Sequence, residues 1–285
     1  MGIWIAALAV TVLAPLLLAW PIRKLSAAED RRALWMAMLI ALPLQPLAFH
    51  ALRLPLHHAL EAGLGRGLLL NTLSLLYAPL TEEPAKWLVL LLPSVRRALA
   101  TRNAIAFALA TGVGFGIGEA WFIASYIARD PALAALPGWM FGGYLVELLQ
   151  VVFLHGAFLL WFARALAAGR APWTGGAIGM ALHFACNLPI VLIALDPFAL
   201  GRAAWTSIVS LWVTALAVGL LVAVQRLARR DRGAALFGTS TCPGCGTSYP
   251  RPLLLAVNLG PTRIERCPSC RRWHRVPARP GAAPS

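Results

Sequence analysis

The chain has few charged residues, and acidic ones are especially scarce. Only 13% of its 285 residues are charged, with eleven aspartates and glutamates, and with two lysines against 23 arginines. A soluble domain carries about 25% charged residues, so the composition excludes an ordinary soluble globular protein. Hydrophobic residues make up 59% of the chain, and the mean hydropathy of +0.71 indicates a membrane protein. The excess of arginine over lysine favours a GC-rich bacterial source.

The N-terminus lacks the features of a cleaved signal. No basic residue precedes the long apolar stretch 2–20, and Arg23 and Lys24 follow it. A myristoylation motif is also missing, because Ala6 stands where that motif has Ser or Thr. We therefore interpret residues 2–20 as an uncleaved membrane anchor.

Apolar runs recur along the chain at the length of a membrane-spanning helix, about 20 residues. Seven such segments are present, although prolines blur the ends of the second and third. They are residues 2–20, 33–50, 68–93, 103–127, 139–163, 174–195 and 203–225. The sequence therefore predicts an all-α polytopic membrane protein with about seven transmembrane helices.

Basic residues in the loops favour one orientation of these helices. Loops on one side hold thirteen arginines and lysines, whereas the alternate loops hold four. Because positive residues concentrate in cytoplasmic loops, we expect a multi-pass protein of the cell membrane with its N-terminus outside and its C-terminus in the cytoplasm. The four exceptions are Arg53, Arg66, Arg129 and Arg202.

Four of the five cysteines form two CxxC pairs separated by 21 residues: Cys242, Cys245, Cys267 and Cys270. Two CxxC turns can direct four thiolates at one tetrahedral zinc ion, so this spacing predicts a structural zinc ribbon. Disulfides are the alternative, and the reducing cytoplasm argues against them. Metal binding would supply the stability that so small a region cannot gain from a core. His274 is interpreted as a surface residue.

The predicted domains follow from these features. Residues 1–227 are predicted to form a helical transmembrane domain, with a catalytic core at 68–195. Residues 228–240 are predicted to be a linker, and residues 241–276 the zinc ribbon, with a short strand at 253–259. Residues 277–285 are expected to be a disordered tail. From Arg226 onward, eleven arginines face only Asp231 and Glu265. This basic tail favours contact with anionic lipid of the bilayer, with nucleic-acid binding as the less favoured alternative.

Several ionisable residues interrupt the predicted spans: Glu82, Glu83, Lys86, Glu119, Glu147, His155 and His183. A charge at the centre of a spanning helix costs about 2.5–3.5 kcal/mol, so such residues must face the bundle interior and pair with one another. At a rise of about 1.5 Å per residue, the glutamates and histidines of spans three to six fall within about 6 Å of the midplane. We expect them to share one chamber.

Glycines and a proline shape the spans that carry these residues. Gly112, Gly114, Gly116 and Gly118 predict close packing of span four, and Gly175 and Gly179 continue into His183 and Asn187 as one stripe of span six. Proline disfavours helical geometry at the residue before it, so span three can break near Thr81 and restart at Pro84. A simple kink at Pro84 is the alternative.

These motifs resemble the PrsW family of intramembrane proteases, which is related to the CAAX prenyl endopeptidases. The resemblance covers roughly residues 70–190 and rests on Glu82-Glu83-x-x-Lys86, Phe115-x-x-x-Glu119, His155 and His183-x-x-x-Asn187. It implies hydrolysis of peptide bonds in membrane-anchored protein substrates, such as an anti-sigma-factor-like regulator. The zinc ribbon lies outside the resemblance.

The resemblance also implies catalytic roles. Glu82 or Glu83 would activate water as a general base, His155 and Glu119 would assist or bind a metal, and His183 and Asn187 would stabilise the oxyanion. Glu119 stands where the CAAX-type pattern has histidine, so a metal-free glutamate mechanism and a metal-dependent one both stay open. Amide hydrolysis needs such a base and such oxyanion donors in any case.

Other polar residues receive weaker roles. Glu147 is interpreted as a supporting or helix-interface group, and Cys186 as a packing residue that points away from the stripe. His50, His57 and His58 are expected near the external loop.

Two other functions compete with a protease. A transporter or ion path also places carboxylates at the midplane, although the two halves of the chain show no repeat. A membrane scaffold would use its zinc ribbon to bind a protein partner, and Glu82 and Lys86 would then be a buried ion pair.

Overall fold

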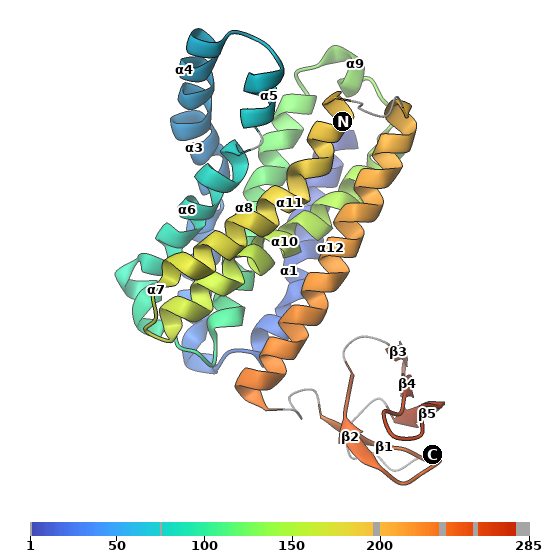
Figure 1. Ribbon diagram of the computed structural model, residues 1–285. Coiled ribbons are helices and arrows are strands. Elements are labelled where there is room, and N and C mark those ends of the chain that lie inside the picture. Colours follow the sequence, from blue (N-terminus) through green and yellow to red (C-terminus); the bar gives the residue numbers. More distant parts are fainter. Residues whose placement is uncertain (1, 75, 196–199, 234–237, 253–255, 278–285) are drawn as a thin grey trace. The chain divides into compact units, whose positions relative to one another are not determined.

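The computed structural model describes residues 2–74, 76–195, 200–233, 238–252 and 256–277. The chain separates into two compact units, residues 1–220 and 221–285. The first unit is helical, and the second contains the end of the last long helix and two small antiparallel sheets (Figure 1).

Twelve α-helices are found in the described residues. They are α1 (Gly2–Lys24), α2 (Arg31–Ala41), α3 (Leu44–Ala48), α4 (Leu54–Leu64), α5 (Leu68–Ser74), α6 (Tyr77–Leu91), α7 (Pro93–Ala98), α8 (Ala104–Ile127), α9 (Pro131–Ala134), α10 (Gly142–Ala167), α11 (Pro172–Leu195) and α12 (Gly201–Arg232). Short 3₁₀ turns, η1 (Ala28–Asp30) and η3 (Gly138–Phe141), precede α2 and α10. A π-helical turn, η2 (Phe49–Arg53), joins α3 to α4.

Helix α8 lies at the centre of the first unit and packs against α1, α2 and α10. Its glycines make this possible. A Cβ atom at Gly112 would overlap the backbone of Gly156 in α10, and one at Gly114 would overlap the carbonyl group of Met38 in α2. Two residues turn a helix by about 200°, so alternate glycines face opposite neighbours. The predicted close packing of this span is confirmed.

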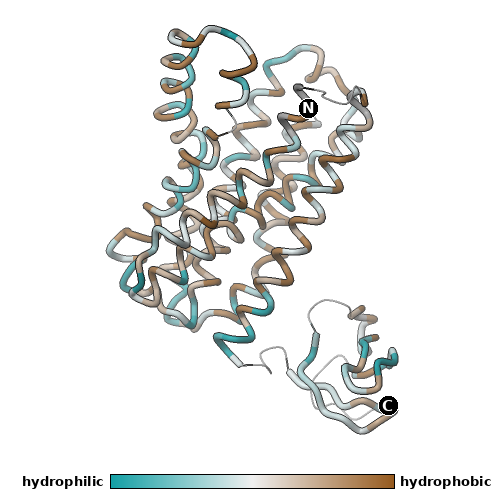
Figure 2. The backbone as a smooth tube through the Cα atoms, viewed as in Figure 1, coloured by the Kyte–Doolittle hydropathy of each residue, from teal (hydrophilic) through white to brown (hydrophobic). Residues whose placement is uncertain are grey.

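Hydrophobic residues recur along most helices of the first unit (Figure 2). Their side chains are exposed on the helices as well as buried between them. In α1, Val10 and Ala14 are buried, whereas Leu16 and Leu17 are 65% and 62% exposed. Such exposed apolar surface suits lipid and not water. The apolar helices therefore indicate a membrane protein.

The described residues hold fewer candidate membrane spans than the seven that the sequence predicted. In the described part of the chain, four helices are long and apolar enough to cross a membrane: Gly2–Lys24, Ala104–Ile127, Gly138–Ala167 and Ala204–Arg232. The pair Ala28–Ala41 and Leu44–Leu64, bent by 42°, makes a fifth if it is counted as one span. Seven spans are not confirmed. The predicted span 68–93 is divided into α5 and α6, and α6, with 15 residues, is too short to cross about 30 Å of hydrocarbon.

The helix break in this region lies between α5 and α6, several residues before the predicted position near Thr81. Helix α5 ends at Ser74, α6 begins at Tyr77, and α6 continues through Pro84 to Leu91. The predicted break at Thr81 is therefore wrong. Glu82 and Glu83 lie within a continuous helix and not at the start of a half-helix. The Thr81 hydroxyl donates to the Tyr77 carbonyl at 2.5 Å within this helix.

The second unit has two sheets. Strand β1 (Thr239–Thr241) pairs with β2 (Ser248–Pro250), and β3 (Ala256–Leu259), β4 (Thr262–Arg266) and β5 (Trp273–Pro277) form the other sheet in that order. The predicted strand 253–259 is thus observed from residue 256 onward. Arg251 links the sheets, because its guanidinium donates to the carbonyls of Thr239 and Pro277 at 3.1 and 2.6 Å.

The segments that flank the ribbon differ in part from the prediction. Helix α12 continues to Arg232, so residues 228–232, assigned to a linker, are helical. Of the predicted disordered tail, Pro277 is the last residue of β5, and residues 278–285 lie outside the described residues.

Candidate active site

Helix α6 brings three ionisable side chains into the interior of the bundle. Glu82, Glu83 and Lys86 are all buried, and none of the Glu83 or Lys86 side chain is exposed. Lys86 lies three residues after Glu83, the spacing at which helical side chains meet, and its Nζ lies 2.6 Å from Glu83 Oε1. This buried pair explains how α6 tolerates both charges.

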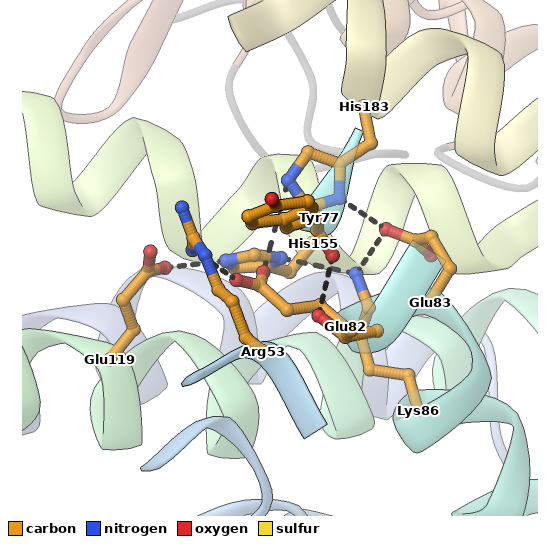
Figure 3. A network of polar contacts seen from close by, with 9 residues as sticks. Arg53, Tyr77, Glu82, Glu83, Lys86, Glu119, His155 and His183 are labelled. Atoms are coloured by element: carbon orange, nitrogen blue, oxygen red, sulfur yellow. Dashed lines mark hydrogen bonds and ion pairs between the residues drawn. The ribbon is translucent and has the colours of Figure 1, made fainter. Parts of the chain in front are cut away.

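Four helices join in one hydrogen-bonded network around Lys86 (Figure 3). Lys86 Nζ lies 3.1 Å from His155 Nδ1 in α10, and His155 Nε2 lies 2.6 Å from Glu119 Oε2 in α8. On the other side, Glu83 Oε1 lies 2.7 Å from His183 Nδ1 in α11. Ionisable residues from the segments predicted as spans three to six thus meet in one network.

The donors in this network assign the imidazole tautomers. A protonated Lys86 can only donate, so His155 Nδ1 accepts and His155 Nε2–H donates to Glu119. The Glu83 carboxylate can only accept, so His183 Nδ1–H donates to it. The Nε2 lone pair of His183 is then the one imidazole position that this network leaves for a substrate or water.

Glu82 stands beside the network and faces open space. Its Oε1 lies 3.7 Å from Arg53 Nη1, and its Oε2 lies 3.8 Å from His183 Nε2. No hydrogen-bond partner for Oε2 is found among the described residues. Glu83 Oε2 is likewise buried without a partner among these residues. The two glutamates differ in their surroundings, because Glu83 Oε1 contacts Lys86 and His183, whereas Glu82 lines a cavity.

A cavity of about 700 Å³ opens from Glu82. Glu119, His155, His183 and Asn187 also line it, whereas Glu83 and Lys86 are not among its lining residues. Ile123, Leu148, Val151, Leu154 and Phe158 form much of its apolar wall. The volume falls in the range of about 300–1,000 Å³ that is typical of ligand sites.

Two weaker predictions can be compared with this cavity. Cys186, interpreted as a packing residue that points away from the stripe, is buried and also lines the cavity. Glu147 lines it as well and is exposed, which places it at the open side and not in a buried helix interface.

The three histidines of the predicted external loop lie in or near η2 and α4. His50 contacts the ring of Phe122, and His57 lies 3.8 Å from Glu61. His50, His57 and His58 belong to neither group of metal-capable side chains in the described part of the chain.

The sequence did not assign Arg53, Tyr77 or Tyr144 to the site. Arg53 was counted as a loop residue, but the π-helical turn carries it to the cavity, where 31% of its side chain is exposed. Tyr144 lines the same cavity and donates to the Ala120 carbonyl at 3.2 Å. The Tyr77 hydroxyl is buried without a hydrogen-bond partner in the described residues.

Glu82, His155 and His183 form one group that could hold a metal ion, since one ligand atom from each lies within 4.8 Å of the others. Two cations, Arg53 and Lys86, face three carboxylates here, which leaves one unbalanced negative charge and favours one further proton or cation. Against a metal, both nitrogens of His155 already have partners. These three side chains could bind a metal only if one His155 nitrogen gave up its contact with Lys86 or Glu119 and bound the ion instead.

The four cysteines of the second unit form the other group. Cys242 Sγ lies 3.7 Å from Cys270 Sγ, and Cys245 Sγ lies 3.8 Å from Cys267 Sγ. Zinc–sulfur bonds of about 2.3 Å in a tetrahedron give edges of about 3.8 Å, whereas a disulfide needs about 2.05 Å. The four thiols thus lie at the spacing of a metal site and could bind a metal such as zinc.

The two CxxC turns have the same backbone pattern. Gly246 N–H donates to the Cys242 carbonyl, and Arg271 N–H donates to the Cys267 carbonyl, at 2.9 and 3.0 Å. Both donors have positive φ, 72° and 61°. His274 is half-buried with Nε2 3.3 Å from Cys270 Sγ, and its ring packs over Gly244, so it is not the simple surface residue expected.

Comparison with family models, curated proteins and solved structures gave no match for this chain.

Proposed function

We propose that the chain is a multi-pass intramembrane endopeptidase of the PrsW type, with Glu82 as its general base. The substrate class is a membrane-anchored protein, for which an anti-sigma-factor-like regulator is one example. The supporting observation is the position of one carboxylate oxygen, Glu82 Oε2. Glu82 Oε2 is buried, lacks a hydrogen-bond partner among the described residues and lies 3.8 Å from His183 Nε2 beside a cavity of about 700 Å³.

A water molecule hydrogen-bonded to both Glu82 Oε2 and His183 Nε2 would have its oxygen directed into this cavity. Glu82 takes one proton from the water as the oxygen attacks the peptide carbonyl, and the same proton passes to the departing amide nitrogen. The products are a carboxylic acid and an amine, and Glu82 returns to the carboxylate. General base catalysis of this kind contributes about 10²–10⁴-fold.

Asn187 supplies a neutral donor at the same cavity. Its side-chain amide lies one helical turn after His183, and a donor aimed at the developing oxyanion contributes about 10²–10³-fold. Glu83 acts by holding His183 Nδ1, and Lys86 by holding Glu83 and His155. These two are positioning residues, because they do not line the cavity.

His155 and Glu119 also line the cavity. In the tautomer that Lys86 favours, His155 Nε2–H donates to Glu119, and this arrangement supports a metal-free glutamate mechanism. A metal held by Glu82, His155 and His183 would supply a Lewis acid and a more acidic water, but it would require His155 to release Lys86 or Glu119.

Comparison of new protein termini tests this proposal without a known substrate. Terminal-peptide mass spectrometry would be applied to membranes of cells that make the unmodified chain, Glu82→Gln or His183→Ala. Both variants should lose the termini that the unmodified chain generates. Glu147→Gln is the matched control, because Glu147 also lines the cavity but is exposed and is absent from the network described above.

Three results would change the proposed function. Termini that persist in Glu82→Gln exclude this residue as the base. A chain that produces no new termini, but whose Glu82→Gln variant loses ion or solute uptake in vesicles, is a transporter. A phenotype that depends only on residues 233–285 indicates a scaffold that acts through its ribbon.

A further inference from the structure

A second cavity, of about 380 Å³, lies between α1, α2 and α8. It shares no lining residue with the cavity around Glu82. The mechanism proposed above gives it no role. Its lining changes from polar to apolar along the helices.

The polar end is at the turn between α1 and α2. Arg23 lies in the last turn of α1, Ser26 in the connection, and Arg31 is the first residue of α2. From there the lining continues as Ala19 and Pro15 along α1. These lie four and eight residues before Arg23, or about 6 and 12 Å at 1.5 Å per residue.

The opposite wall has the same gradient. Leu34, Trp35 and Met38 follow Arg31 along α2, and Met38 lies about 10 Å from the turn by the same rise. Ala110 and Val113 of α8 form an apolar floor. Trp35 is 59% exposed, which fits the edge of a groove that lipid can enter from the side.

Nearby acidic groups do not face the groove. Glu29 and Asp30 of the same turn lie 3.2 and 3.7 Å from Arg102, and Asp30 also accepts from the Ala27 N–H at 2.8 Å. They are therefore engaged outside the groove lining, and the two groove arginines give its mouth a positive charge. A basic pocket between membrane helices suits an anionic head group.

We propose that this groove binds one anionic phospholipid, with its phosphate at Arg23 and Arg31 and an acyl chain along Ala19, Trp35 and Met38. Ser26 borders the phosphate position, but its hydroxyl already donates to the Ile22 carbonyl at 2.7 Å. The two halves of the site match the two halves of the ligand. A free phosphate would fill only the polar half, and a zwitterionic lipid would gain less from the two arginines.

Native mass spectrometry of the full chain tests this proposal. Detergent-purified protein would be titrated with phosphatidylglycerol and with phosphatidylcholine that carry the same acyl chains. We expect a preference for phosphatidylglycerol of about thirtyfold, which corresponds to about 1 kcal/mol for each of two arginines near an anionic surface. Arg23→Gln with Arg31→Gln should remove the preference, and Arg23→Lys with Arg31→Lys should keep it.

A charge-matched control separates the groove from a general basic surface. Arg97→Gln with Arg170→Gln removes the same charge from two exposed arginines outside the cavity lining and should leave the preference intact. Ala19→Trp should fill the apolar half and lower retention of both lipids several-fold, and inorganic phosphate should not compete with lipid. Equal binding of both lipids to the unmodified chain would overturn the proposal, as would equal losses in the two double variants or displacement of lipid by phosphate.

Discussion

Nζ of Lys86 lies 3.1 Å from Nδ1 of His155, and both side chains are buried. The same Nζ lies 2.6 Å from Glu83 Oε1, so one ammonium group connects α6 to α10 and balances a carboxylate that has no contact with solvent. Phe115 and Phe158 place their rings 5.1 and 5.8 Å from this ammonium, which stabilises the cation further. Lys86 is therefore the centre of the network.

The first prediction concerns this ammonium. Lys86→Met should lower the free energy of unfolding by about 3–5 kcal/mol, because it leaves Glu83 as a buried charge without its cation. Adding Glu83→Gln should restore much of the stability, since the remaining charge is removed. Thermal unfolding in one detergent measures both effects. Cleavage should stay low in the double variant, because His155 and His183 have lost the groups that orient them. A double variant no more stable than Lys86→Met would show that the pair does not carry this energy.

The second prediction separates the two adjacent glutamates. Glu83→Gln should be destabilising by several kcal/mol, because it weakens contacts to both Lys86 and His183. Glu82→Gln should change stability by about 1 kcal/mol or less, since Glu82 has only Arg53 and His183 at 3.7 and 3.8 Å. Both variants should lose cleavage. Equal destabilisation by the two changes would contradict the division into a base and a positioning residue.

Parts of this site followed directly from the sequence. A buried charge is costly wherever it lies in a span, so Glu82, Glu119, His155 and His183 were expected to meet, and all four line one cavity. Arg53 did not follow, because a π-helical turn depends on packing and leaves no clear pattern in the sequence. The length of the helix around Glu82 was also missed. Hydropathy does not show that an apolar run is divided between α5 and α6, and Pro84, the obvious breaker, lies inside the helix.

The third prediction tests the packing that brings α8 to α10. A methyl group at Gly112 would overlap the backbone of Gly156, next to His155. Gly112→Ala should therefore lower stability by about 1–3 kcal/mol and reduce cleavage, because α10 must move away and carry His155 with it. Gly63→Ala is the matched control. Nothing lies within 4 Å of a Cβ atom at Gly63, and alanine favours helix by up to about 1 kcal/mol, so its unfolding temperature should stay the same or rise.

The fourth prediction assigns the metal. The full chain should bind about one zinc ion, measured by inductively coupled plasma mass spectrometry, and Cys242→Ser should lower this stoichiometry. Four thiolates complete a tetrahedron and leave no open position for a substrate, so an ion at these cysteines would stabilise the ribbon and would take no part in the proposed hydrolysis. A chain that lacks residues 233–285 should then hold no zinc and should still generate new termini. Metal retained by that shorter chain, and lost on His183→Ala, would belong to Glu82, His155 and His183, and would favour metal-dependent hydrolysis over a glutamate that acts on water alone.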